Sequence, residues 1–100
     1  MQQLSFLPPA PFSPRWPNPG SMSDLALGWL LAGDVLDHPT FEARTASWRL
    51  AAYVRELRAL GWPVETEGAA APTADVPGRT IGRYTLPPAV AALARALRRG

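Results

Sequence analysis

Arginine supplies every positive side chain of this sequence. All ten basic residues are arginine, and three of them, Arg49, Arg55 and Arg58, lie in one short segment, 47–60. The planar guanidinium donates paired hydrogen bonds to phosphate and stacks on flat rings, which suits nucleic acid. Arginine is also enriched at protein interfaces. The missing lysine is explained more simply by codon bias, because alanine, proline and glycine are abundant as well.

The usual combinations of catalytic and metal-binding residues are missing. The sequence has no cysteine, which excludes disulfides and thiolate metal sites. His38 is the one histidine, so a zinc site with several histidines or a Ser-His-Asp triad cannot form. Because no Gly-rich phosphate loop or supported carboxylate pair is present either, we expect a protein that is not an enzyme and has no metal or cofactor.

Length and composition indicate one globular domain. The chain has 100 residues, of which 47% are hydrophobic, and such a chain can bury a core. No apolar run is long enough to cross a bilayer, and the N-terminus lacks the pattern of a signal peptide. We therefore expect a cytoplasmic protein without a membrane partner.

The N-terminal segment differs from the rest in its proline content. Residues 1–19 hold half of the 12 prolines, which predicts an extended arm rather than a helix. The expected organisation is a Pro-rich arm over 1–20 and a folded domain over 21–100. Phe12 and Trp16 are apolar residues of this arm, so the arm either packs on the domain or binds a partner.

Capping residues and stop signals predict the first two helices. Ser21 with Asp24 resembles a capping box and begins a helix over 22–32, which Gly33 ends. A second helix is expected over 38–45, with Asp37 or His38 as its N-cap. The predicted core face of the first helix contains Leu25, Gly28, Trp29 and Ala32, widened by Leu27, Leu30 and Leu31.

Hydrophobic spacing gives the third helix, 48–60, with Ser47 as its N-cap. One stripe should face the core: Leu50, Tyr53, Val54, Leu57 and Leu60. The outward residues are Arg49, Ala51, Ala52, Arg55, Glu56, Arg58 and Ala59. Trp48 lies in the first turn, where it either contacts a partner or covers the seam with the second helix or the arm. We expect the second of these roles.

The C-terminal third predicts a β-hairpin followed by a helix. Strands at 64–67 and 79–86 flank a loop, 68–78, and Arg83 can pair with Glu65 or Glu67 across the strands. The last helix starts at Pro87 and Pro88. Its expected core stripe contains Val90, Leu93 and Leu97.

This order of elements is that of a mainly α protein with a small β-hairpin, a winged helix-turn-helix. It would have a three-helix core, a two-stranded wing and an extra C-terminal helix. The sequence resembles the small winged-helix domains of bacteriophages and prophages, known as helix-turn-helix domain-containing proteins. The resemblance covers roughly 22–87 and rests on LGWLLAGDVLDHPTFEA, WRLAAYVRELRALGWPVET and GRYTLP.

The resemblance and the arginines predict binding to double-stranded DNA, as a regulator or accessory factor, with 47–60 as the recognition helix. Arg49 is the main candidate for reading bases, because Ala51 and Ala52 cannot make bidentate contacts. The expected DNA-binding residues are Ser47, Trp48, Arg49, Arg55, Arg58, Arg79 and Arg83.

The acidic hairpin favours an alternative function. Residues 65–78 carry Glu65, Glu67 and Asp75 without a positive charge, and phosphate would be repelled there. The alternative is a protein-binding winged helix, such as a phage-encoded inhibitor of a host protein or defence complex. Phe12, Trp16 and Trp48 would then contact the partner. The sequence leaves open whether the chain is a monomer or a homodimer.

Overall fold

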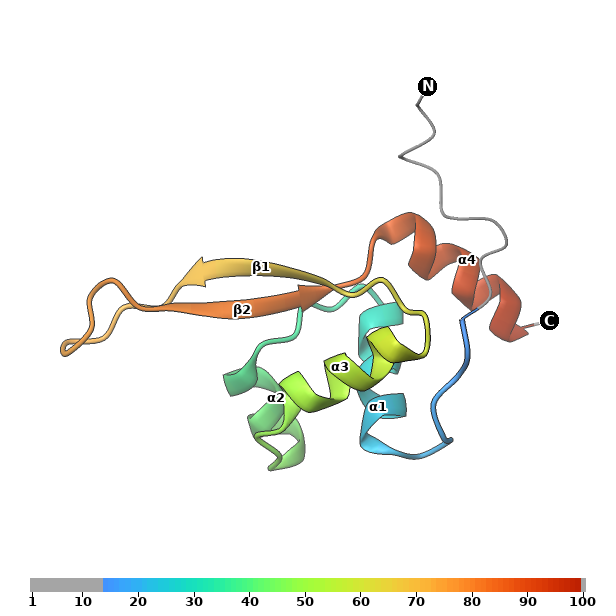
Figure 1. The fold of residues 1–100 in the computed structure, drawn as a ribbon, viewed down its shortest axis with the longest axis horizontal. Helices are drawn as coiled ribbons and strands as arrows, with labels where there is room; N and C mark the ends of the chain where they lie inside the picture. Colours follow the sequence, from blue (N-terminus) through green and yellow to red (C-terminus); the bar gives the residue numbers. More distant parts are fainter. Residues whose placement is uncertain (1–13, 100) are drawn as a thin grey trace, which may run out of the picture.

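The computed structural model describes residues 14–99. Four helices form the body of the molecule. A two-stranded antiparallel hairpin projects from one end of this body, and α4 lies at the opposite end (Figure 1). This is a small mixed α/β fold. The elements in chain order are α1 (Met22–Leu31), α2 (His38–Thr45), α3 (Leu50–Ala59), β1 (Glu65–Ala70), β2 (Thr80–Thr85) and α4 (Pro88–Arg99).

The predicted start and end of α1 are confirmed. The Ser21 hydroxyl accepts a hydrogen bond from the Asp24 backbone N–H at 3.2 Å. The Asp24 carboxylate accepts from the Gly20 N–H at 2.9 Å, one residue before the position that a capping box uses. Gly33 adopts a left-handed φ of 95° just after the helix, which a glycine tolerates at a C-terminus.

The core face of α1 differs from the prediction. Leu25 is 42% exposed and Ala32 is exposed, whereas the buried residues are Ser23, Ala26, Leu27, Leu30 and Leu31. Trp29 packs partly buried against the core as predicted, whereas the prediction was wrong for Leu25 and Ala32. The predicted margin of the face, Leu27, Leu30 and Leu31, is buried in the core. The reason is that α1 carries apolar residues on most of its circumference, so spacing alone does not select a face.

The α2 helix agrees with the prediction and the start of α3 does not. Asp37 caps α2 by accepting the Thr40 N–H at 2.9 Å. In contrast, α3 begins at Leu50 with Arg49 at the N-cap position, so Ser47, Trp48 and Arg49 precede the helix. Ser47 lies two residues before the observed N-cap, and its hydroxyl accepts the Arg49 N–H at 3.3 Å in a local turn.

The core side of α3 is as expected. Leu50, Val54 and Leu57 are buried, while Tyr53 and Leu60 pack partly buried against the same cluster. The core joins all four helices and the segments around the hairpin. Its buried residues are Ala26, Leu27, Leu30, Leu31, Leu36, Phe41, Leu50, Val54, Leu57, Trp62, Val64, Leu86, Val90, Ala91 and Ala94.

The hairpin is longer than predicted. Pairing runs from Glu65 opposite Thr85 to Ala70 opposite Thr80, so 68–70 belong to a strand and not to the loop. Their Gly-Ala-Ala composition is typical of a loop, but the hydrogen bonds to β2 override this weak preference. A further pair of hydrogen bonds, of 3.0 and 2.8 Å, joins Leu36 to Tyr84 and attaches the segment between α1 and α2 to β2.

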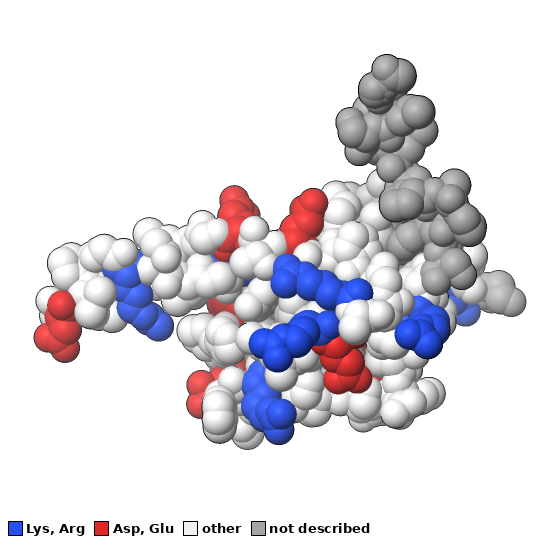
Figure 2. All heavy atoms as spheres, in the orientation of Figure 1, with Lys and Arg blue, Asp and Glu red and all other residues white. Residues whose placement is uncertain are grey.

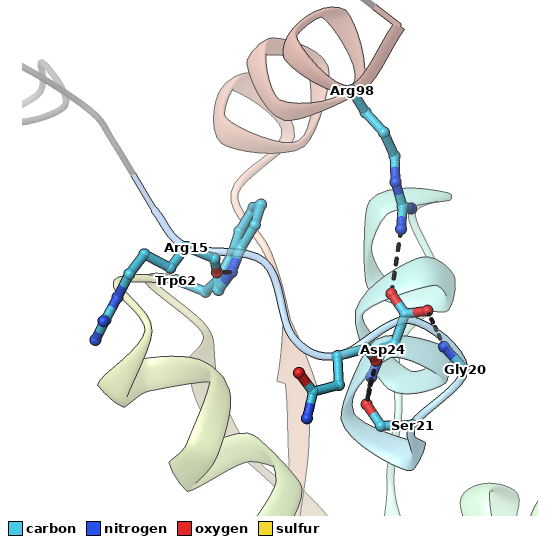
Figure 3. Close-up of polar contacts among 7 residues, drawn as sticks. Arg15, Gly20, Ser21, Asp24, Trp62 and Arg98 are labelled. Atoms are coloured by element: carbon cyan, nitrogen blue, oxygen red, sulfur yellow. Dashed lines mark hydrogen bonds and ion pairs between the residues drawn. The ribbon is translucent and has the colours of Figure 1, made fainter.

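The α4 helix packs on α1 through small residues. Val90, Ala91 and Ala94 are buried, whereas Leu93 and Leu97 are 40% and 51% exposed. The expected stripe was therefore wrong for both leucines, because the alanine side of the helix allows the closer approach to α1. The guanidinium groups of α4 hold the two helices together: Arg95 donates to the Leu31 carbonyl, and Arg98 pairs with Asp24 at 3.1 Å (Figure 3).

Residues 14–20, the described part of the arm, pack on the domain. This is one of the two alternatives that the sequence left open for the arm. The Arg15 N–H donates to the Leu60 carbonyl at 2.8 Å. The buried Trp62 indole donates to the Arg15 carbonyl, also at 2.8 Å (Figure 3). Trp16 lies edge-on against Trp62, with 4.9 Å between ring centroids. Phe12 lies outside the described residues.

Candidate functional site

The exposed side of α3 carries the two arginines that are free to bind a ligand. Figure 2 shows positive side chains gathered over α3, with negative ones beside them. Arg49 and Arg55 are exposed, and within residues 14–99 neither guanidinium makes a hydrogen bond or an ion pair. Ala51 is exposed and Ala52 is half-buried, so the residues between the two arginines include short apolar side chains.

Arg58 belongs to the same helix but is already engaged. Its Nε and Nη2 atoms donate to the Val64 carbonyl at 3.0 and 2.8 Å, and Nη2 also donates to the Thr66 hydroxyl at 2.6 Å. The guanidinium thus connects α3 to the start of β1. Arg58 is a residue that positions the hairpin, which the sequence pattern did not indicate.

Trp48 is exposed in solvent, contrary to the expectation that it covers a seam. Its side chain is 73% exposed, the largest value among the exposed large hydrophobic residues of 14–99. The backbone on both sides is fixed: the Ser47 N–H donates to the Thr45 hydroxyl at 3.0 Å, and the Arg49 N–H donates to the Ser47 hydroxyl. The protein therefore holds this indole outward from an ordered loop.

The turn before this loop contains strained backbone. Ala46 has a left-handed φ of 61°. Among the non-glycine residues of 14–99, no other has a positive φ. Its N–H donates to the Glu42 carbonyl at 2.7 Å and closes α2. An alanine in this region costs about 1–2 kcal/mol, and strain of this kind is often found next to functional segments. Sequence analysis missed Ala46, because alanine gives no signal for a left-handed turn.

The hairpin arginines lie apart from the two free arginines of the α3 segment. Arg83 is directly opposite Glu67 in the register, so both side chains share the face that also carries Glu65. Thr66, which contacts Arg58 of α3, points to the other face. Arg83 therefore shares its face of the hairpin with two carboxylates and is turned away from α3. Arg79, at the hairpin tip, donates weakly to the Ala71 carbonyl at 3.4 Å.

Asp37 adds a third carboxylate near Arg83. The Thr40 backbone N–H lowers the pKa of Asp37, and the positive charges of Arg83 and His38 act in the same direction, while burial opposes them. Arg83 is thus close enough to Asp37 for its charge to favour the carboxylate form. Of the seven predicted DNA-binding residues, only Trp48, Arg49 and Arg55, with Ser47 as their support, form one accessible surface, which we call the α3 surface.

Trp16, the described arm residue of the alternative site, is engaged in internal packing. Its ring lies against Trp62 on one side, and the Arg98 guanidinium is 4.8 Å from its centroid. It keeps 38% of its surface exposed. Trp48 is therefore the better candidate for contact with a partner of either kind.

The described residues contain neither a candidate metal site nor a membrane-spanning helix. Within 14–99, no group of acidic or histidine side chains could hold a metal ion, and no helix combines the length and hydrophobicity needed to cross a membrane. No protein-family model matches the chain, and neither a curated protein nor a solved structure matches it significantly.

Proposed function

We propose that this protein is a winged helix-turn-helix of phage or prophage type that binds double-stranded DNA. The order of elements supports this: α1, α2 and α3 pack around one core, and the hairpin follows directly. The pairing of Leu36 with Tyr84 is the further contact expected when the segment between the first two helices joins the wing as a short third strand. In this proposal α3 is the recognition helix and β1–β2 the wing.

The free arginines of the α3 surface are the observation that carries the proposal. Arg49 and Arg55 are separated by six residues, which corresponds to about 9 Å along a helix axis. Phosphates of one DNA strand follow each other at about 3.4 Å along the duplex axis, so both side chains can reach the same stretch of backbone. The alanines between them allow close approach and contact a thymine methyl at most. Phosphate contacts then supply most of the affinity, and base readout is modest.

This function places the protein with DNA in the cytoplasm, as a small regulator or accessory factor. The test is a mobility-shift titration with random duplex at about 50 mM salt and at higher salt. The double variant Arg49→Ala, Arg55→Ala should bind more weakly and reduce the slope of log K against log salt by about 2. Arg83→Ala is the matched control, because Arg83 faces away from α3. The affinity of this variant for the duplex should stay unchanged. A folded wild-type protein that shifts no duplex at low salt would rule the function out.

Protein binding is a second candidate, which the charge of the hairpin favours. Glu65 and Glu67 lie exposed on one face, and Trp48 is an exposed aromatic of the kind found in interface hot spots. The partner would be a host protein, and the chain an inhibitor of that protein or of a defence complex. A complex recovered from host lysate after nuclease treatment and in moderate salt, and lost with Trp48→Ala, would support this function over DNA binding.

A further inference from the structure

Trp48 differs from the other three tryptophans in its surroundings. Trp29 contacts Phe41 and the Arg44 guanidinium, and Trp16 and Trp62 contact each other. Within the described residues Trp48 has no such aromatic or cationic neighbour, although hydrophobic burial would stabilise the protein. We propose that Trp48 stacks on an unpaired base, so that the preferred substrate is duplex DNA carrying an unpaired nucleotide. This inference rests on the proposed DNA binding.

The ordered loop around Trp48 supports a stacking role. Ser47 is fixed through its N–H and its hydroxyl, which also lies 3.5 Å from the Tyr53 hydroxyl. Arg49 is fixed through its N–H and forms the N-cap of α3. The backbone on both sides of the Trp48 indole is thus held in place before a ligand binds. A rigid aromatic ring on a fixed backbone loses little entropy on contact, which suits a stacking platform.

The charges around the ring fit a nucleic acid better than an apolar partner. Arg49 follows Trp48 directly and Arg55 lies in α3, so two exposed positive side chains follow the ring along the chain and are available to phosphates. Glu56 is the one acidic residue of α3. In an intact duplex both faces of each base are covered by its neighbours, and an indole can reach edges and sugars only. An unpaired base offers its face, and stacking on tryptophan is strong for any base.

The test compares three DNA ligands of the same sequence: an intact duplex, a duplex with one bulged 2-aminopurine, and a duplex with a single-stranded end carrying 2-aminopurine. Wild type should bind the two ligands with an unpaired base about tenfold more tightly than the intact duplex. Stacking on Trp48 should also quench the 2-aminopurine fluorescence. Trp48→Ala should abolish the preference and the quenching, and Trp48→Phe should restore part of both.

The control variant is Leu97→Ala, which removes an exposed apolar side chain from α4 at the other end of the molecule. It should keep the full preference for unpaired bases. Equal binding of all three ligands by wild type overturns the stacking role and leaves the DNA-binding function standing. Absence of binding to every ligand overturns the function itself. Unchanged preference in Trp48→Ala assigns the stacking to another residue, and so also overturns the inference.

Discussion

Arg55 and Arg58 show how two arginines of one helix face can serve different purposes. Arg58 bonds to the Val64 carbonyl and the Thr66 hydroxyl, whereas Arg55 makes no hydrogen bond or ion pair within 14–99. We expect Arg58→Ala to lower the free energy of unfolding by about 1–2 kcal/mol, because the bonds to β1 are lost. Arg55→Ala should change it by less than about 0.5 kcal/mol. Urea unfolding of the two variants measures this difference.

The same pair separates stability from DNA affinity. Arg55→Ala should reduce the salt slope of DNA binding by about 1, because one phosphate contact is lost. Arg58→Ala should leave the slope nearly unchanged as long as the protein is folded. A stable Arg58→Ala variant whose DNA binding has a smaller salt slope would contradict this. It would show that Arg58 leaves β1 to contact DNA.

Asp37 gives the fold a dependence on acid pH. The Thr40 N–H bonds to its carboxylate and holds the pKa in the folded protein below the ordinary value of 3.8. A lowered folded pKa stabilises the protein above the unfolded pKa, and this contribution is lost as the pH falls through the folded value. We expect the free energy of unfolding to decrease below about pH 4 for this reason.

Substitution of Asp37 separates the cap from the charge. Asp37→Asn keeps a good N-cap without a titrating group, so part of the acid-dependent decrease should disappear. Asp37→Ala should lower stability by about 1 kcal/mol at neutral pH, because the cap is lost. Denaturant unfolding at neutral and acid pH tests both, and an unaltered pH profile in Asp37→Asn would assign the effect to other carboxylates.

The turn between α2 and α3 is the element that presents the α3 surface. Ala46 adopts its left-handed conformation there with a φ of 61°, which glycine adopts without strain. We expect Ala46→Gly to raise the free energy of unfolding by about 1 kcal/mol. Thermal unfolding measures the gain. Ala43→Gly is the control, since it places a glycine inside α2 and should destabilise the protein by about 1 kcal/mol.

The bounds of α1 and α2 were easier to predict than the buried faces of α1 and α4. Ser21, Asp37 and Gly33 act through local bonds or local backbone preference, so the bounds of α1 and α2 were predicted to within a residue. The buried side of α1 and α4 depends on which neighbour packs there. Both helices carry apolar residues on more than one side, and the choice between Leu93 and Ala94 is made by the close approach of α1.

The candidate site was predictable in composition and not in geometry. Arg49 and Arg55 were identified because α3 has a regular apolar stripe, and whatever lies opposite such a stripe is exposed. The bond from Arg58 to a backbone carbonyl depends on the path of the chain after Gly61, which no residue pattern encodes. The exposure of Trp48 follows from the turn at Ala46 and the late start of α3, and neither was visible in the sequence.

At the scale of the whole molecule, Arg98 joins three segments that are distant in sequence. Its guanidinium pairs with Asp24 of α1 at 3.1 Å (Figure 3). The same group lies over the ring of Trp16, 4.8 Å from its centroid. Because Trp16 also packs on Trp62, α4 and 14–20 are held to the domain through connected contacts. We expect Arg98→Ala to increase amide hydrogen exchange in α4 and in 14–20 together, with a loss of about 1 kcal/mol in stability.

Arg44 offers a control with the same chemistry at another place. It pairs with Asp34 at 3.1 Å and lies 4.8 Å from the centroid of Trp29, so Arg44→Ala removes an equivalent ion pair and ring contact. Its effect on hydrogen exchange should appear around α2 and leave α4 protected. If Arg98→Ala accelerates exchange at the end of α4 alone, the arm is held by Trp62 and the Arg15 hydrogen bonds without help from Arg98. If both regions respond, the arm and α4 form one unit, far from the α3 surface, and DNA affinity should be the same in both variants.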